Sequence, residues 1–278
     1  MHRSVAKIVG ILEAISASEA GTDLEEISHV VGISRSATYR ALAALVERGL
    51  VVRDGEAHRY RIGPWGLRLA RAYAHAESLI VVSRPHLQRL RDLTDETVCL
   101  SVVSGDQCVC VEELPSPKII KFSQGVGAAG PLYAGASGKV LLAHLPSHVQ
   151  KRILKRLRLR PIAPRTVTDK DVLLDHLEEI RRRGYATSRG ERIVGAAAVA
   201  APIWGPDRVK VTALGVFGPD TRLSAERIRE VIPALLEAAR AISTDLQAFA
   251  HTLPHVARQH GRAGRPVRKR AAVQLMRR

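Results

Sequence analysis

The stretch ISRSATYRAL, residues 33–42, decides how the first part of this 278-residue sequence is interpreted. Ser34 is of a residue type that caps helix N-termini, and Gly49 is of the type that ends helices. Together they predict a helix from Arg35 to Arg48. One face of this helix is apolar and consists of Ala37, Ala41, Leu42 and Leu45.

Two further helices are predicted before this one. Apolar residues repeat with a period of about 3.6 residues between Arg3 and Ser16, which indicates an amphipathic helix. Thr22 to Glu25 predict a capping box, in which the Thr22 hydroxyl accepts a hydrogen bond from the amide of the third helical residue. Gly32 then ends this second helix. Two short helices joined by a tight turn that contains glycine have the spacing of a helix-turn-helix.

A β-hairpin is predicted directly after the third helix. Asp54-Gly55 lies between the alternating stretches 50–53 and 58–62, which is a strong hairpin signal, and a basic hairpin at this place is a wing. In a helix-turn-helix the second helix enters the major groove with its N-terminal residues at the base edges. We therefore predict that bases are contacted by Arg35, Ser36, Tyr39 and Arg40, and phosphates by Arg59 and Arg61. The alternative is a small helical domain that mediates protein contacts only.

The charge balance favours a polyanionic partner such as nucleic acid. The chain has 43 Lys and Arg against 27 Asp and Glu, a net charge of +16. Residues 1–63 carry eight basic and eight acidic side chains, so charge alone does not locate a DNA-binding surface there. Residues 251–278 carry eight basic and no acidic side chains and are predicted to be a disordered basic tail. A solubilising extension without a partner is the alternative for this tail.

Membrane and secreted classes of protein are not indicated. The longest apolar run is far shorter than the roughly 20 residues that span a bilayer. The N-terminus lacks the apolar region of a signal peptide. Three cysteines cannot form a closed disulfide framework, so we expect a cytoplasmic protein with no membrane partner.

The remainder of the chain predicts a second, larger domain. Residues 64–91 are predicted to be a helical linker, and residues 92–250 mix strand and helix patterns. Strand pairs that alternate with helices indicate an α+β domain with one antiparallel sheet and helices packed on it. The expected strands are 98–103, 108–111, 118–123, 196–203 and 209–217, and the expected helices lie near 137–143, 151–160 and 168–184 and after Ser224.

Several catalytic motifs nearly match in this domain, and each of them fails. Gly125 to Gly130 spells GxGxxG, but Pro131 follows at once and the acidic residue of a dinucleotide site is missing. The stretch that ends in Gly138-Lys139 lacks the first glycine of a phosphate-binding loop and the second glycine of a nucleophile elbow. No catalytic set and no cofactor are therefore expected.

The three cysteines leave a small set of alternatives open. Cys108 and Cys110 point to the same face of a predicted strand, and with Cys99 they could bind a metal or sense an oxidant. No histidine lies at ligand spacing, and a free cysteine is commonly a small buried hydrophobe. We therefore expect no metal site.

Three motifs in this order resemble the IclR family of bacterial transcriptional regulators. They are residues 33–42, residues 130–143 (GPLYAGASGKVLLA), and residues 184–191 (GYATSRGE), which are followed by Gly195, Ala200 to Pro202, and Gly218-Pro219. The resemblance covers residues 3–250 and leaves out the basic tail. It implies a winged helix-turn-helix in residues 1–63, joined by a linker helix to a GAF/PAS-like effector-binding domain. It also implies a homodimer or homotetramer that binds palindromic DNA operators.

The resemblance further implies a pocket for a small-molecule effector, often an organic acid or an intermediate of aromatic degradation. The implied pocket residues are Gly135, Ala136, Ser188, Ala196, Ala198, Gly215 and Phe217. Acid-binding relatives carry small polar groups on the last strand, where this sequence has Gly215 and Phe217. A carboxylate would then rely on backbone amides at the helix start near Ser137, which favours a partly apolar effector such as an aromatic acid or lactone.

The implied function is a ligand-responsive regulator, expected to be a repressor of catabolic genes and not an enzyme. Two alternatives remain open at this point. The larger domain could act as an enzyme on a small metabolite, since catalytic residues can be scattered in sequence. The basic tail could instead drive sequence-independent DNA binding, which would show a steep salt dependence.

Overall fold

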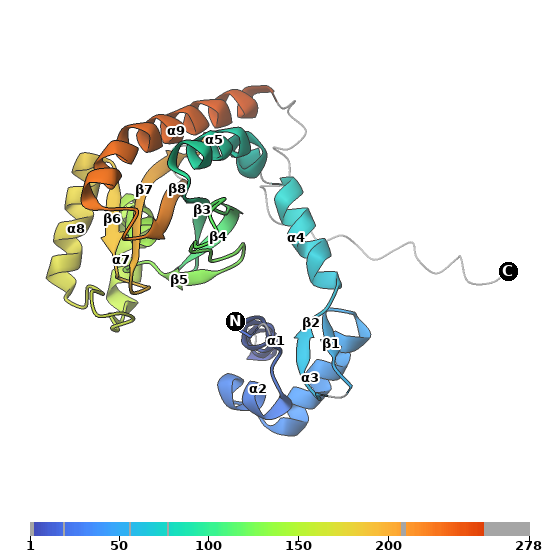
Figure 1. Ribbon diagram of the computed structural model, residues 1–278. Helices are drawn as coiled ribbons and strands as arrows, with labels where there is room; N and C mark the ends of the chain where they lie inside the picture. Colours follow the sequence, from blue (N-terminus) through green and yellow to red (C-terminus); the bar gives the residue numbers. More distant parts are fainter. Residues whose placement is uncertain (1–2, 19, 56, 77, 207–209, 253–278) are drawn as a thin grey trace. The chain divides into compact units, whose positions relative to one another are not determined.

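The computed structural model describes residues 3–18, 20–55, 57–76, 78–206 and 210–252 of the chain (Figure 1). Internal contacts divide the chain into two compact units, Met1–Glu77 and Ser78–Arg278. Of the basic tail predicted for 251–278, residues 253–278 lie outside the described part. Within the residues described, none of the helices combines the length and apolar character needed to cross a lipid bilayer.

The first unit is a helix-turn-helix followed by a hairpin and one more helix, as the sequence predicts. Its elements are α1 (Arg3–Ser16), α2 (Leu24–Val31), α3 (Arg35–Glu47), β1 (Val51–Arg53), β2 (Tyr60–Ile62) and α4 (Trp65–Ala76). The two strands are antiparallel, with Val51 opposite Ile62. Apolar side chains from all three helices of the motif and from the hairpin form one core, which includes Ile11, Ile27, Leu42, Val51 and Tyr60.

The N-cap of α2 lies one residue later than the sequence predicts. Asp23 is the cap, and its carboxylate accepts hydrogen bonds from the amides of Glu25 and Glu26, both at 2.9 Å. Thr22 is buried and exchanges backbone hydrogen bonds with Tyr60 of the hairpin instead. The prediction of Thr22 was wrong because a long-range pairing, invisible in the local pattern, uses this residue, while aspartate caps helices as well as threonine does.

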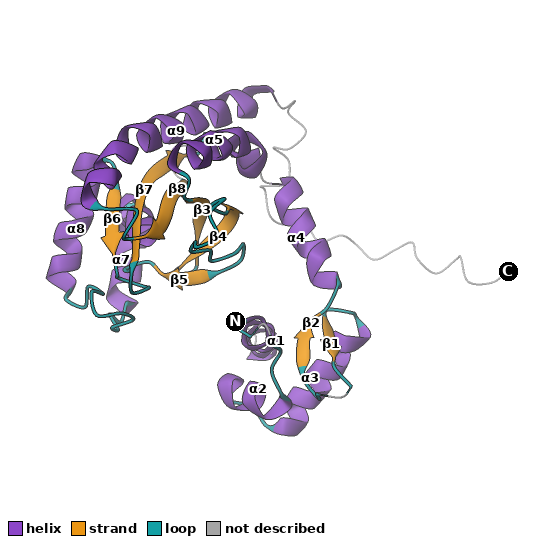
Figure 2. Cartoon of the chain, viewed as in Figure 1, coloured by secondary structure: helices purple, strands orange, loops and turns teal. Residues whose placement is uncertain are grey.

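The second unit contains a six-stranded antiparallel sheet between two layers of helices (Figure 2). Its elements are α5 (Ser78–Thr94), β3 (Thr97–Ser104), β4 (Gln107–Leu114), β5 (Ala129–Pro131), α6 (Ala136–His144), α7 (Ser147–Arg156), α8 (Lys170–Arg183), β6 (Ala186–Arg189), β7 (Ala196–Trp204), β8 (Val211–Pro219) and α9 (Ala225–Thr252). The strand order is β5-β4-β3-β8-β7-β6. The predicted α+β class with one antiparallel sheet is therefore confirmed.

Each face of the sheet has its own apolar core. One core lies between the sheet and the helices α5 and α9, with Leu87, Leu235 and Ile242 fully buried. The other lies between the sheet and the helices α6 and α8, and it includes Val140 and Leu177. The candidate ligand site lies on this second face, where α6 begins.

Several element predictions for the second unit were wrong in detail. Residues 118–123 form no strand, and Ile119 is 98% exposed. Their β-branched residues favour a strand, but residues 127–131 already pair with the outer edge of β4. The short strands β5 and β6 were not predicted, and α7 ends at Arg156 instead of residue 160. The predicted turn at Asp207 and strand start at Val209 lie outside the described residues.

The segment predicted to be a helical linker, residues 64–91, contains two helices. α4 belongs to the first unit, and α5 belongs to the second unit and packs against α9. The division between the units falls between Glu77 and Ser78. α5 also continues to Thr94, three residues past the predicted end of the linker.

Candidate functional site

The start of α3 presents all four side chains that were predicted to contact bases. Arg35, Ser36, Tyr39 and Arg40 are exposed, and 53% of the surface of Tyr39 is accessible. On the opposite face of the helix, the buried Thr38 receives a hydrogen bond from Ser28 at 3.0 Å, which fixes α3 against α2. Ser34 caps α3, as predicted, by accepting from the amide of Ala37. The Ser34 cap and the buried Ser28–Thr38 hydrogen bond thus orient α3 so that the four predicted base-contacting side chains face solvent.

The two wing arginines are placed by contacts within the first unit. Arg59 donates to the carbonyl oxygen of Gly21 at 3.1 Å, and Arg61 lies 3.6 Å from the carboxylate of Asp54. Arg53 was not singled out from the sequence. It lies on the same hairpin, where its guanidinium is 3.0 Å from the Nδ1 atom of His58. All three arginines are exposed and retain N–H groups that can reach phosphates.

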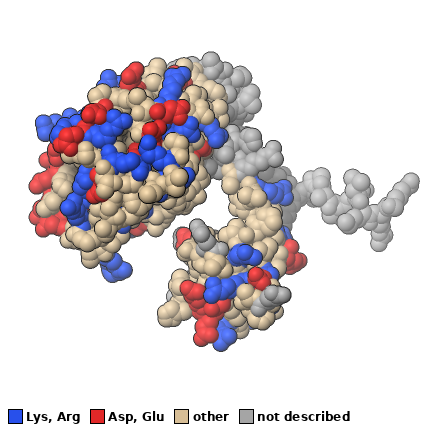
Figure 3. All heavy atoms as spheres, in the orientation of Figure 1, with Lys and Arg blue, Asp and Glu red and all other residues tan. Residues whose placement is uncertain are grey.

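Charged side chains form no single basic patch on the face that Figure 3 shows. On the face shown in Figure 3, basic and acidic side chains are interspersed over each unit. Arg35, for example, lies 3.7 Å from Glu25, and both side chains are largely exposed. Such an exposed pair contributes little to stability and can rearrange when a phosphate or base approaches.

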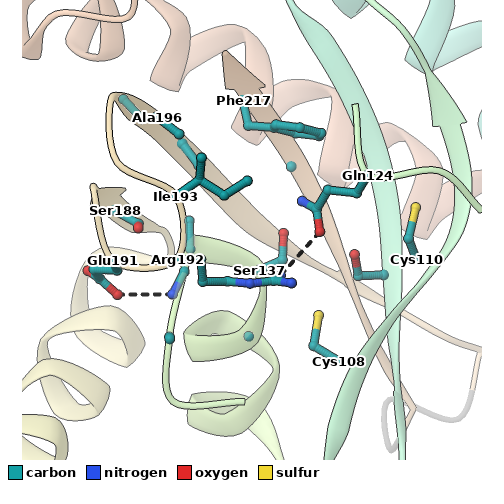
Figure 4. A pocket seen from close by; sticks show the side chains of 18 of the residues that line it. Cys108, Cys110, Gln124, Ser137, Ser188, Glu191, Arg192, Ile193, Ala196 and Phe217 are labelled. Carbon is teal, nitrogen blue, oxygen red and sulfur yellow. Dashed lines mark hydrogen bonds between the residues drawn. The ribbon is translucent and has the colours of Figure 1, made fainter. Parts of the chain in front are cut away.

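The second unit contains a cavity that brings together every predicted effector residue (Figure 4). It has an empty volume of about 660 Å³, part of which is open to solvent. The sheet forms one wall and the start of α6 forms another. The seven residues come from α6 and its cap (Gly135, Ala136), β6 (Ser188), β7 (Ala196, Ala198) and β8 (Gly215, Phe217).

The cavity also holds a cation that the sequence analysis missed. Arg192, in the loop between β6 and β7, donates to the side-chain oxygen of Gln124 at 3.2 Å and to the carbonyl of Ala129 at 3.5 Å. Its guanidinium lies so close to Gly130 that a β-carbon there would overlap it. In the part of the chain that the structure describes, no Asp or Glu forms an ion pair with Arg192. Among the described residues, the positive charge in this cavity therefore has no acidic partner.

The first turn of α6 adds a second feature that favours anions. Gly135 is the N-cap, has φ of 85°, and supplies no side-chain hydrogen bond to the helix. The residues of the first turn, Ala136 to Gly138, line the cavity. Helix N-termini carry unsatisfied amides and a partial positive charge, so they bind carboxylates and phosphates. This is the helix start near Ser137 at which the sequence places a carboxylate.

Glu191, next to Arg192, is occupied by other contacts. Its carboxylate accepts hydrogen bonds from the ammonium of Lys139 at 2.5 Å and from the amide of Gly135 at 2.9 Å. The side chains of Lys139 and Glu191 are only 4% and 9% exposed. This buried ion pair holds the loop that carries Arg192 against α6.

The three cysteines are buried and lie in or beside the same cavity. Burial raises the pKa of Cys108 to about 11, with a partial opposing effect from Ser101 and Arg192. The pKa of Cys99 is also raised, first by its hydrogen bond with Cys110 and then by burial. Neutral thiols are poor nucleophiles and poor metal ligands. Among the described residues, no group of three His, Cys, Asp or Glu side chains could hold a metal ion.

Comparisons with known proteins place these observations in a family. The family model described as the bacterial transcriptional regulator IclR C-terminal domain matches residues 71–244, and that of the IclR helix-turn-helix domain matches residues 4–55. The chain is 32% identical over 241 residues to the HTH-type transcriptional regulator BhcR of Paracoccus denitrificans, which covers 87% of this chain and 86% of BhcR. It is 28% identical over 243 residues to the HTH-type transcriptional repressor AllR of Escherichia coli, covering 87% and 90% of the two chains.

A solved structure of similar fold contains a bound ligand. An IclR homologue from Microbacterium hydrocarbonoxydans, complexed with 4-hydroxybenzoate, superposes with a TM-score of 0.73. It is 27% identical in sequence, and the match covers 88% of this chain and 99% of that one. The same two-part organisation is therefore present in a protein that binds an aromatic acid.

Proposed function

The chain belongs to the IclR family of bacterial transcriptional regulators, and we propose that a small organic acid in the cavity of its second unit controls the affinity of its first unit for a DNA operator. The observation that carries this proposal is the guanidinium of Arg192, which has no acidic partner among the described residues and shares the cavity with the start of α6. We further propose that the protein represses catabolic genes as a homodimer or homotetramer. The similarity to the repressor AllR supports repression as the direction of control.

In this proposal the exposed start of α3 reads the major groove. Arg40 pairs with a guanine, and Arg35, Ser36 and Tyr39 contact further base edges or phosphates. The wing arginines Arg59 and Arg61 hold the DNA backbone, and Arg53 extends that contact. Two copies of the motif on one operator require half-sites about one helical turn apart, or a multiple of it, so the operator is a palindrome.

The proposed effector is a monocarboxylate with a compact apolar or aromatic body. Its carboxylate binds between Arg192 and the first turn of α6, which supplies charge-assisted hydrogen bonds. Its body contacts Phe217 and the alanines of β7. Arg192 favours an acid over a neutral lactone, because a lactone leaves the guanidinium without a counter-charge. The 4-hydroxybenzoate bound by the similar protein has this chemistry.

The effector changes DNA affinity by shifting a population of conformations. It stabilises the conformation in which Arg192 and α6 contact the carboxylate, and it must bind that conformation more tightly than the alternative. If the two conformations hold the DNA-binding units at different spacings, the effector changes the affinity of the protein for its operator. Because linkage is reciprocal, the operator changes the affinity for the effector by the same factor.

Calorimetric titration tests the effector site. Benzoate and 4-hydroxybenzoate are expected to bind, and Arg192→Met is expected to weaken both at least tenfold, about 1.4 kcal/mol. Arg165→Met, which removes an exposed arginine outside the cavity, is the matched control and leaves affinity unchanged. Equal affinity in the Arg192→Met variant would exclude the proposed anchor. Tight binding of only short 2-oxo acids would exclude the aromatic class.

Footprinting tests the DNA-binding function. The protein is expected to protect a bounded palindromic site upstream of its own gene or of a neighbouring gene at physiological salt. Uniform coverage that modest added salt abolishes would instead indicate sequence-independent binding driven by the basic tail.

A further inference from the structure

A second cavity lies behind the edge strand β6, between α8 and the first turns of α9. It is larger than the first, with an empty volume of about 1150 Å³ that includes its open mouth. Ile180, Ile228 and Ile232 supply apolar wall, while Lys139, His176 and several arginines supply polar groups. Of the residues implied by the family resemblance, only Ser188 lines it.

Two buried polar groups of this cavity have unused hydrogen-bonding capacity. The ammonium of Lys139 has three N–H donors, and in the described part of the chain Glu191 is its one hydrogen-bond acceptor. The Nδ1 atom of His176 is buried and has no partner among the described residues. Buried polar atoms nearly always have at least one partner, so the His176 nitrogen is an exception. It lines the same cavity as the spare N–H donors of Lys139, and together they point to a polar ligand that reaches both.

The charge of the lining indicates what that ligand is. Four cations line the cavity, Lys139, Arg183, Arg189 and Arg229, against two acids, Glu179 and Glu191. Each cation has an acidic partner: Lys139 pairs with Glu191, Arg183 with Glu179 at 3.1 Å, Arg189 with Asp220 at 3.4 Å, and Arg229 with Glu226 at 2.9 Å. Asp220 and Glu226 lie outside the lining, and the Arg229–Glu226 pair is largely exposed, so this arginine can exchange its partner for a ligand. Cations that outnumber the acids in the lining, and that can share or exchange their partners, lie beside three isoleucines. This combination suits an organic anion with more than one carboxylate and a hydrocarbon backbone.

The two cavities share a wall. Ser188 and Glu191 line both of them, and both side chains are labelled in Figure 4. One oxygen of Glu191 accepts from Lys139, which faces the second cavity, and the other accepts from the amide of Gly135 at the start of α6. A single carboxylate thus connects a donor of the second cavity with the helix start of the first.

We propose that the cavity behind β6 is a second small-molecule site, which binds a small polycarboxylate and weakens ligand binding in the first cavity through Glu191. An anion that binds the free N–H groups of Lys139 competes with Glu191 for that ammonium. Glu191 then presents more uncompensated negative charge to the start of α6, where it repels a carboxylate. The coupling between the cavities rests on the function proposed above, whereas the second site itself does not.

Citrate, a tricarboxylate, is the probe for the second site. The full chain is titrated by calorimetry at constant ionic strength, and one saturable site per chain is expected. His176→Leu removes the unpartnered nitrogen, and Ala225→Trp obstructs the mouth from an exposed position at the start of α9. Each is expected to weaken citrate binding at least tenfold. Lys151→Met removes an exposed charge on α7, outside both cavities, and is expected to have no effect.

Two outcomes overturn the second site: no saturable citrate binding, or equal binding in the wild type, His176→Leu and Ala225→Trp, with circular dichroism showing that the variants are folded. Equal binding would mean that citrate associates non-specifically with a basic protein.

The coupling is read from benzoate titrations with and without saturating citrate. Benzoate affinity is expected to fall three- to tenfold, and citrate affinity to fall by the same factor in saturating benzoate, because linkage is reciprocal. Unchanged affinities overturn the coupling. If benzoate does not bind even without citrate, the proposed effector function fails, while the citrate comparison between His176→Leu and wild type still decides the second site.

Discussion

Arg40 is the residue at which the DNA-binding proposal is tested most directly. It is exposed on the second turn of α3, opposite the buried Thr38. We expect Arg40→Ala to weaken operator binding by about 1–3 kcal/mol, because a bidentate contact with guanine is lost. Arg48→Ala, at the other end of the same helix, is the control and should cost less. Fluorescence anisotropy with the footprinted operator measures both, and an unchanged affinity of Arg40→Ala would remove this residue from the reading surface.

Cys108 makes the stability of the second unit sensitive to high pH. Burial raises its pKa from the usual 9.0 to about 11 in the folded state. The unfolded chain therefore releases the thiol proton near pH 9, while the folded chain keeps it until about pH 11. The contribution of the buried thiol to stability is complete below pH 9 and is lost as the pH rises toward 11.

Urea unfolding of wild type and Cys108→Ala between pH 8 and pH 11 measures this effect. The free energy of unfolding of the wild type should fall by about 2–3 kcal/mol more than that of the variant, since one pKa unit corresponds to about 1.4 kcal/mol. Comparing the two chains cancels the titration of lysines and tyrosines. Parallel pH profiles would show that Cys108 ionises as easily in the folded chain as in the unfolded one.

At the scale of elements, α6 is unusual because its packing overrides helix propensity. Alanine is normally more stable than glycine inside a helix by about 1 kcal/mol. At Gly138, however, a β-carbon would lie 2.8 Å from the carbonyl oxygen of Pro131 and 3.0 Å from that of Leu132. These are backbone atoms, which cannot move aside without displacing the segment that leads into the cavity.

Gly138→Ala is therefore expected to destabilise the second unit by about 1–3 kcal/mol. Gly10→Ala in α1 is the matched substitution, because the nearest atom to its β-carbon is a Val31 methyl at 3.5 Å, an ordinary contact. That variant should stabilise the first unit by about 0.5–1 kcal/mol. Differential scanning calorimetry measures both, and a stabilising Gly138→Ala would show that the approach of α6 to Pro131 is not restrictive.

At the scale of the whole molecule, the basic tail is expected to add affinity for DNA without adding specificity. All eight of its basic side chains lie after residue 252. Each phosphate contact adds about 0.9 to the slope of log binding constant against log salt. A chain ending at residue 252 should therefore keep the same footprint and show a shallower salt slope. An identical slope would mean that the tail makes no phosphate contacts, and a lost footprint would mean that it contributes to specific binding.

The elements that the sequence predicts correctly are those specified by neighbouring residues. Ser34 caps α3, and a hairpin with Asp54-Gly55 in its loop follows that helix. The second strand of the hairpin begins at Tyr60, two residues later than the sequence predicts. Apolar periodicity also identifies which side of each helix is buried, because 3.6 residues per turn is a property of the helix itself. All seven effector residues implied by the family resemblance line the first cavity, although Arg192 and Gln124, which also line it, were not among them.

The features that the sequence does not predict depend on which distant segments meet in the folded chain. Thr22 pairs with Tyr60 and leaves the cap to Asp23, and residues 118–123 stay out of the sheet because the edge of β4 is already occupied. Arg192 enters the cavity because its loop crosses Gly130, 62 positions earlier, where the missing side chain leaves room. Lys139 and Glu191 likewise join two cavities from positions 52 apart. Periodicity and capping depend on residues that are close in sequence, so they indicate local geometry and which face of an element is buried. They contain no information on which charged side chain a distant segment places against that face.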